Sequence, residues 1–226
     1  MRIHHAQGVT GAAGAKGVVV IIDVFRAFTV SAYALAGGAE RCLLVKTLEE
    51  GRTLHASIPG SVLSAEVDGL PVPGIPLSNS PTAIAGCDLA GRVLVQRTSA
   101  GTQAVAAATG EGPIFAASLV VAKATVHKLR ALDPSEATLV ASGQPDHLED
   151  QACARYIESL LEGRRPDLEA LLRPLKRSER YATLSSGAVP GFPPSDVRLA
   201  LDADRFDFAM PVRAQQGPYE LVAERG

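Results

Sequence analysis

The chain of 226 residues carries 22 Lys and Arg against 24 Asp and Glu, a formal net charge of −2, with 46% hydrophobic and 4% aromatic residues. This balance is typical of a soluble globular protein and argues against nucleic acid as the main partner, because that binding depends on a surplus of basic side chains. The three cysteines lie far apart, and no segment is apolar for long enough to span a bilayer or form a signal peptide, so we expect a cytoplasmic protein.

Strands and helices alternate through the first third of the chain. Residues 17–23 form a continuous apolar run that ends at Asp23, which predicts a strand covered on both faces. The pattern then predicts helices over 27–36 and 48–57 and strands over 41–45 and 61–65. After a proline-rich loop over 69–81, Ser80 and Pro81 indicate the start of a short helix, with Asn79 before it as a donor to a ligand.

The alternation continues further along the chain. It predicts strands over 92–96, 113–117 and 137–141 and helices over 102–108, 119–132 and 147–161. Charged helical segments around 167–176, a Gly/Pro-rich stretch over 186–194, a helix near 195–203 and a strand over 206–212 follow. We therefore expect a three-layer α/β/α fold with a mostly parallel or mixed sheet, as one domain over 1–226. Residues 164–226 either pack back on this sheet or form a small C-terminal subdomain.

Asp23 and Arg26 follow the first buried strand, where ligands bind in open α/β sheets. A carboxylate there needs a cation or hydrogen bonds, so one interpretation is Mg²⁺ at Asp23 with Arg26 binding an anion beside it. The alternatives are a structural Asp–Arg pair or an Asp at the start of a helix. Position 25 is Phe, whereas phosphatases that form an aspartyl intermediate often have a second Asp there.

A second group of polar residues joins a predicted strand to a predicted helix. Its candidate ligand-binding residues are Arg97, Thr98, Ser99, Gly101 and Thr102. Hydroxyls and backbone amides at a helix N-terminus suit a phosphate group, although an ordinary capped turn has the same composition. The pattern differs from the nucleotide-binding loop, so ATP or GTP hydrolysis is not indicated.

Further acidic residues complete the set of candidates. Glu66 follows the predicted strand over 61–65, which suits a metal ligand or general base, whereas a solvated turn residue is the plainer alternative. Asp146 and Glu149 have the spacing of a capping box, which makes Asp150 the better candidate ligand. The five histidines show no metal-binding spacing, so carboxylates favour a hard cation over zinc.

Taken in order, these segments resemble the 2-phosphosulfolactate phosphatase (ComB-like) family, magnesium-dependent acid phosphatases linked to coenzyme M synthesis. The resemblance spans about residues 17 to 213. Its motifs are Asp23-Val-Phe-Arg-Ala-Phe-Thr29, Glu66 with Gly69, Asn79-Ser80-Pro81, Thr98 to Thr102, Ser118-Leu119, Leu148-Glu-Asp150 with Cys153, and Asp204 to Val212. The chain has Ala100 and Val121 where the family often has asparagine.

The resemblance implies hydrolysis of the phosphomonoester of a small anionic metabolite, first of all 2-phosphosulfolactate to sulfolactate and phosphate. It implies that Asp23, Glu66 and Asp150 hold Mg²⁺ or activate water, with Asp23, Arg26 and Glu66 as catalytic residues. The predicted substrate-binding residues are Arg26, Asn79, Ser80, Arg97, Thr98, Ser99, Gly101 and Thr102. The alternative is a catalytically reduced relative that binds a phosphorylated or carboxylated ligand. A homodimer is the commonest assembly for soluble proteins.

Overall fold

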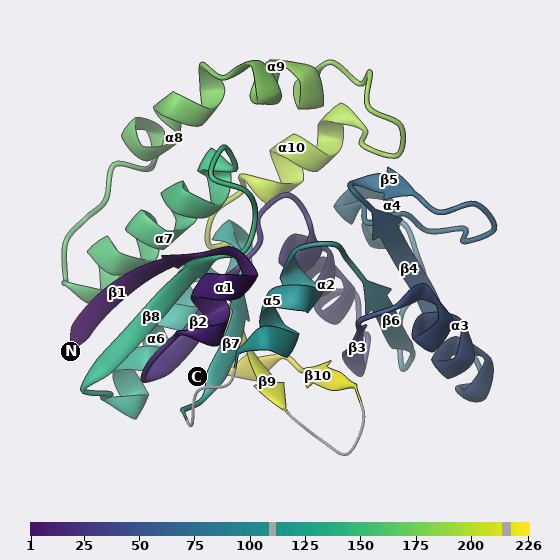
Figure 1. Ribbon diagram of the computed structural model, residues 1–226, viewed down its shortest axis with the longest axis horizontal. Coiled ribbons are helices and arrows are strands. Elements are labelled where there is room, and N and C mark those ends of the chain that lie inside the picture. Colours follow the sequence, from purple (N-terminus) through teal and green to yellow (C-terminus); the bar gives the residue numbers. More distant parts are fainter. Residues whose placement is uncertain (109–111, 214–217) are drawn as a thin grey trace.

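The computed structural model describes residues 1–108, 112–213 and 218–226 (Figure 1). Within them, one mixed, mostly parallel sheet has the strand order β1-β8-β2-β7-β9-β10-β3-β6-β4-β5, with β11 paired to β9. The strands are β1 (Arg2–Gln7), β2 (Val18–Ile22), β3 (Arg41–Val45), β4 (Val62–Val67), β5 (Leu70–Pro71), β6 (Val93–Arg97), β7 (Ile114–Ala117), β8 (Glu136–Ala141), β9 (Phe208–Arg213), β10 (Tyr219–Leu221) and β11 (Glu224–Arg225).

Helices cover both faces of the sheet, which confirms the three-layer α/β/α prediction. They are α1 (Gly8–Ala13), α2 (Ala27–Ala36), α3 (Leu48–Ser57), α4 (Pro81–Ala85), α5 (Gly101–Ala107), the 3₁₀ helix η1 (Leu119–Val121), α6 (Ala122–Leu132), α7 (Leu148–Leu161), α8 (Leu168–Lys176), α9 (Glu179–Ser185) and α10 (Pro194–Ala200). In β2, Val19 and Ile21 pack in the core with α2 and α5, whereas Val20 and Ile22 pack in the core with α6 and α7. No residue of β2 exceeds 4% exposure, as its unbroken apolar sequence predicts.

The sheet consists of two parallel groups of strands that an antiparallel hairpin separates. Strands β1, β8, β2 and β7 are parallel to one another, and so are β3, β6 and β4. Three successive antiparallel pairings, β7 with β9, β9 with β10 and β10 with β3, join them, so the second group runs opposite to the first. The predicted strand over 206–212 thus lies in the middle of the sheet.

Helix α2 links the two groups of strands next to the end of β2. The side chain of Gln96 in β6 donates to the carbonyl of Ala27 at 2.9 Å and accepts from the hydroxyl of Ser31 at 2.6 Å. All three residues are buried. These bonds fix the beginning of α2 over β6, which brings the segment after β6 close to the segment after β2.

Several elements differ from the sequence prediction. Strand β1, helix α1 and helix α9 were not predicted, because half-exposed segments rich in Gly, Ala and polar residues carry little hydrophobic periodicity. Strand β4 continues to Val67, so Glu66 lies inside a strand rather than in a turn. Ser80 does cap α4 by accepting from the amide of Ala83, with Pro81 at the first helical position, as predicted.

The segment after α7 crosses the molecule before the chain returns to the sheet. Helices α8, α9 and α10 form an arc over one edge of the sheet, from α7 to α4 (Figure 1). Leu172 and Leu175 of α8 pack in the core with α7, and α10 contacts α4. Strands β9, β10 and β11 follow within or against the sheet. None of the described helices is long and apolar enough to cross a membrane.

Candidate active site

Asp23 lies directly after β2 and is 5% exposed. One carboxylate oxygen, Oδ1, accepts from the amide of Ala27 at 2.9 Å, and Oδ2 accepts from the hydroxyl of Ser142 at 3.2 Å. A Cβ atom at Gly101 would lie 2.8 Å from Asp23 Oδ2 and 2.9 Å from the Cβ of Ala27, so any side chain at position 101 would force its neighbours to move. The structure therefore brings Asp23 and the beginning of α5 together, and the absence of a side chain at Gly101 makes room for that approach.

The surroundings of Asp23 favour its protonated form. Burial raises the pKa of Asp23 from 3.8 to about 6, and the negative charges of Glu66 and Glu149 add to the rise. The amide of Ala27 and the hydroxyl of Ser142 act in the opposite direction, but they compensate only part of the shift. A carboxyl group with a pKa near neutrality inside a cluster of acids is suited to exchange a proton or to bind a cation.

Arg26 does not pair with Asp23, so the Asp–Arg pair considered from the sequence is wrong. Its Nη1 donates to Asp196 Oδ2 at 2.8 Å and to the carbonyl of Gly191, and its Nη2 donates to the carbonyl of Gly69 at 3.2 Å. The guanidinium also lies 4.1 Å from the centre of the Phe192 ring. Arg26 is thus a buried cation close to Asp23 that makes three hydrogen bonds within the protein. The helix-start interpretation of Asp23 is correct, because Asp23 accepts from the first amide of α2.

Asp196 in α10 is a site residue that the sequence did not reveal. It is fully buried and accepts from Arg26, from the Ser80 hydroxyl at 2.8 Å and from the amide of Thr82 at 3.0 Å. Ser80 therefore holds Asp196 as well as capping α4. In the sequence, Asp196 follows two prolines and a serine like any acid in the first turn of a helix, and no local signal marks its distant partners.

Glu66 holds two loops together rather than facing solvent. Its carboxylate accepts from the amide of Gly69 at 2.6 Å, from the amide of Ser99 and from the Ser99 hydroxyl at 3.2 Å. Arg97 donates to the carbonyl of Glu66 and, at 3.1 Å, to the Ser99 hydroxyl. The structure therefore brings three of the candidate residues, Glu66, Arg97 and Ser99, together, and it uses both oxygens of Glu66 within the protein.

Thr98 and Thr102 form the capped turn that was the plainer interpretation of this loop. The amide of Thr102 donates to Thr98 Oγ1 at 3.1 Å, and Thr102 Oγ1 donates to the Thr98 carbonyl at 2.7 Å. The side-chain oxygen of Asn79 accepts from Gln96 of β6 at 3.1 Å. All three predicted residues are buried and bonded inside the protein.

Asp150 supports the loops after β2 and β8. Its Oδ1 accepts from the amide of Val24 at 2.8 Å, and its Oδ2 accepts from the amide of Gly143 at 3.1 Å. Burial raises the pKa of Asp150, and the charges of Asp23 and Glu149 raise it further. The predicted capping box is wrong: α7 begins after His147 without a side-chain cap, and Glu149 instead accepts from Arg180 of α9 at 2.8 Å.

The three predicted magnesium ligands do not form a ready-made cage. Within residues 1–108, 112–213 and 218–226, no three His, Cys, Asp or Glu side chains gather around one point. Backbone amides occupy both oxygens of Glu66 and of Asp150. Mg²⁺ is commonly held by one or two carboxylates together with water and substrate phosphates. Asp23, whose pKa the neighbouring acids raise, fits this mode best, because a cation there would relieve the repulsion.

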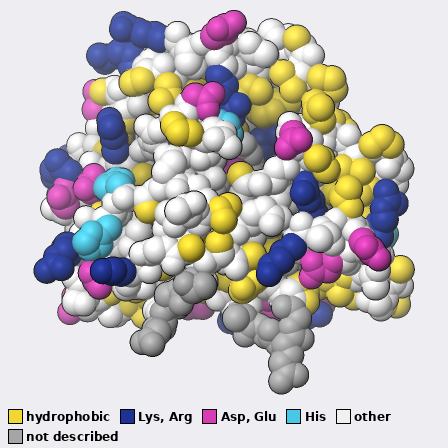
Figure 2. Space-filling view, viewed as in Figure 1, with side chains coloured by type: hydrophobic (Ala, Val, Ile, Leu, Met, Phe, Trp, Pro, Cys, Tyr) yellow, Lys and Arg dark blue, Asp and Glu magenta, His cyan; other side chains and the backbone are white. Residues whose placement is uncertain are grey.

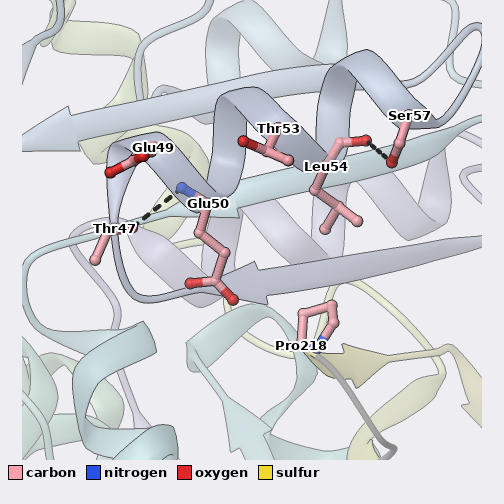
Figure 3. Close-up of a pocket in the computed structure, with 7 residues that line it drawn as sticks. All are labelled: Thr47, Glu49, Glu50, Thr53, Leu54, Ser57 and Pro218. Carbon is pink, nitrogen blue, oxygen red and sulfur yellow. Dashed lines mark hydrogen bonds between the residues drawn. The ribbon is translucent and has the colours of Figure 1, made fainter.

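The surface of the protein shows a group of charged side chains in one place and a hollow in another. Figure 2 shows acidic, basic and histidine side chains close together just below the arc that α9 and α10 form in Figure 1. A separate hollow lies between α3 and Pro218 and is lined by Thr47, Glu49, Glu50, Thr53, Leu54 and Ser57 (Figure 3). It contains none of the predicted site residues. We therefore place the candidate active site at the ends of β2, β6 and β8.

Comparison with known proteins identifies the family of the chain. The family model described as 2-phosphosulpholactate phosphatase matches residues 3–182. Three relatives named "Probable 2-phosphosulfolactate phosphatase" come from Bacillus subtilis (35% identical, 64% of each chain), Carboxydothermus hydrogenoformans (39%, covering 63% of this chain and 60% of the relative) and Thermoplasma volcanium (27%, 85% and 87%). The chain thus spans less than two thirds of the first two relatives. By the family match, it belongs to the 2-phosphosulpholactate phosphatase family.

Proposed function

We propose that this chain is a phosphoric monoester hydrolase acting on a small, multiply anionic metabolite, with 2-phosphosulfolactate as the first substrate to test. The observation that carries the proposal is Asp23, a buried carboxyl group with a pKa of about 6 beside the beginning of α5, where a Cβ at position 101 would meet it. The names of the relatives supply the substrate. The near-zero net charge of the chain is compatible with an anionic substrate, because a few local cations determine the field at the site.

In the proposed reaction, water attacks phosphorus and Asp23 takes the proton of the attacking water. The bond from phosphorus to the ester oxygen breaks, and that oxygen leaves as the alcohol after taking a proton from solvent. A pKa near 6 leaves Asp23 ionised at neutral pH while making it a stronger base than an ordinary carboxylate. Arg26 is held in place by Asp196, so its positive charge acts on the phosphoryl group as part of a fixed field. When bound at Asp23, Mg²⁺ would neutralise charge on the phosphoryl oxygens and lower the pKa of the attacking water, and Asp23 would then serve as the metal ligand instead of the base.

The second candidate is a relative that binds a phosphorylated or carboxylated ligand without turnover. Ala100 and Val121 lack the side-chain amide of asparagine. The Thr98 hydroxyl accepts from the amide of Thr102, and the Thr102 hydroxyl donates to the carbonyl of Thr98. This loop therefore offers few free donors to a phosphoryl group. Turnover separates the two candidates, because a binder is stabilised by the ligand and releases no phosphate.

The test measures phosphate release from 2-phosphosulfolactate and from a panel of sugar and hydroxyacid phosphates, with Mg²⁺ or with EDTA. Asp23→Asn should lower kcat by about 100-fold or more, the usual contribution of a general base. Asp207→Asn is the matched control, since Asp207 is 80% exposed in its surface pair with Arg225. Full turnover by Asp23→Asn would contradict this site, and equal rates in EDTA would contradict the proposed Mg²⁺ requirement.

A further inference from the structure

Ser118, the residue after β7, carries a buried hydroxyl that lacks a partner. The residue is 0% exposed, and its Oγ makes no hydrogen bond to any residue that the structure describes. Buried hydroxyls in native proteins nearly always have a partner in the protein or in bound water. This hydroxyl is therefore free to bond a bound water or a ligand group.

The register of the sheet places Ser118 next to Asp23. Strand β7 runs parallel to β2 with Ala117 opposite Ile22, and the amide of Asp23 donates to the Ala117 carbonyl at 3.0 Å. Successive side chains of a strand alternate between its faces, and the chain is still extended at Ser118. Ala116 packs in the core with α2, so Ser118, two residues later, lies on that same face. Asp23, two residues after Ile21, lies there as well.

A second serine occupies the matching position on the other side of Asp23. In β8, Ala141 lies opposite Ile22, and Ser142 follows it. The hydroxyl of Ser142 donates to Asp23 Oδ2 at 3.2 Å. Two serines thus flank Asp23 on adjacent strands, and only one of them bonds to its carboxylate. Because Ser142 donates to Asp23 and Ser118 does not, the Ser118 hydroxyl is available to a ligand that lies against Asp23.

We propose that Ser118 Oγ donates a hydrogen bond to a phosphoryl oxygen of the substrate bound at Asp23. This inference rests on the proposed phosphatase function and adds a substrate-binding residue to it. A serine hydroxyl rotates freely and can donate to an oxyanion without bringing a further charge into the buried acid cluster. The hydroxyls of Thr98, Ser99 and Thr102 all donate within the protein, so Ser118 supplies a free hydroxyl that the loop lacks.

The test compares wild type with Ser118→Ala in three measurements: kcat/KM, the inhibition constant of inorganic phosphate, and Tm with and without phosphate. Ser118→Ala should lower kcat/KM and weaken phosphate binding about 10- to 100-fold, the effect of one hydrogen bond to a charged group. Its Tm without phosphate should equal or exceed that of wild type, because an unsatisfied hydroxyl is removed. Ser118→Cys, which fills similar space with a much weaker donor, should lose phosphate affinity in the same way.

Ser185→Ala is the matched control, because its hydroxyl is also buried without a partner but lies in α9. It should leave kcat/KM and phosphate binding unchanged. The proposal is overturned if Ser118→Ala binds phosphate as wild type does, whatever happens to its Tm. In that case wild-type turnover still supports the proposed function. A wild-type protein that neither releases nor binds phosphate would overturn both.

Discussion

The ionised carboxylate of Asp23, which the proposed reaction needs, lowers the stability of the folded protein at neutral pH. Because the pKa of Asp23 is raised to about 6, the folded protein binds this proton more tightly than the unfolded chain, whose pKa is near 3.8. The contribution of Asp23 to stability is therefore fully present below pH 3.8 and is lost as the pH rises through 6. At pH 7 the ionised group costs about 3 kcal/mol, from 1.36 kcal/mol for each pKa unit.

Asp23→Asn should consequently be more stable than wild type at pH 7, while it loses activity. The neutral amide keeps an acceptor for the amide of Ala27 and carries no charge into the acid cluster. Urea unfolding in EDTA at pH 5 and pH 7 gives the difference in unfolding free energy, which should be larger at pH 7. A variant that is less stable than wild type at both values would show that the Asp23 carboxylate stabilises the fold.

At the scale of elements, the close approach of α5 to α2 is what forms the site. A methyl group at position 101 would meet Asp23 Oδ2 at 2.8 Å and the Cβ of Ala27 at 2.9 Å. Gly101→Ala should therefore destabilise the protein by about 1–3 kcal/mol, the usual cost of overpacking, and should lower kcat by shifting Asp23. Thermal unfolding and phosphate release measure the two effects.

Gly86→Ala provides the control for this substitution. Gly86 ends α4 with a φ of −88°, and a Cβ there would meet only carbonyl oxygens at 3.6 and 3.8 Å. It should change both measurements little. Equal effects of the two substitutions would mean that the contact between Gly101 and Asp23 does not matter for activity.

Local sequence patterns were sufficient to predict the elements that carry most of the site. The apolar run of β2 ending in Asp23 and the Ser80-Pro81 start of α4 are determined by neighbouring residues, and the structure confirms both. The capping box at α7 failed because Glu149 is bound by Arg180, which lies in a different helix. Burial and a long-range ion pair determine the partner of the Glu149 carboxylate, and a four-residue sequence spacing reveals neither of them.

At the scale of the whole molecule, one buried and one partly buried ion pair join the arc of α9 and α10 to the rest of the fold. Arg180 of α9 donates to Glu149 of α7, and Arg26, before α2, donates to Asp196 of α10. Arg26 and Asp196 are 170 residues apart in the chain, so no spacing rule predicts their contact. The sequence likewise does not show that β9 and β10 separate two groups of strands, because strand order depends on which edges meet in three dimensions.

The pair of Arg26 and Asp196 yields the prediction that tests this arrangement. Asp196→Asn leaves the buried guanidinium of Arg26 without its counter-charge and should cost about 3–5 kcal/mol of unfolding free energy. The double variant Arg26→Met with Asp196→Leu removes both charges and should recover much of that loss, because an apolar replacement of a buried pair is often neutral. Phosphate release should stay low in the double variant, since the positive charge beside Asp23 is gone. Asp207→Asn, which breaks an exposed pair, should change stability by less than about 1 kcal/mol. Recovery of both stability and turnover in the double variant would show that Arg26 serves the fold alone.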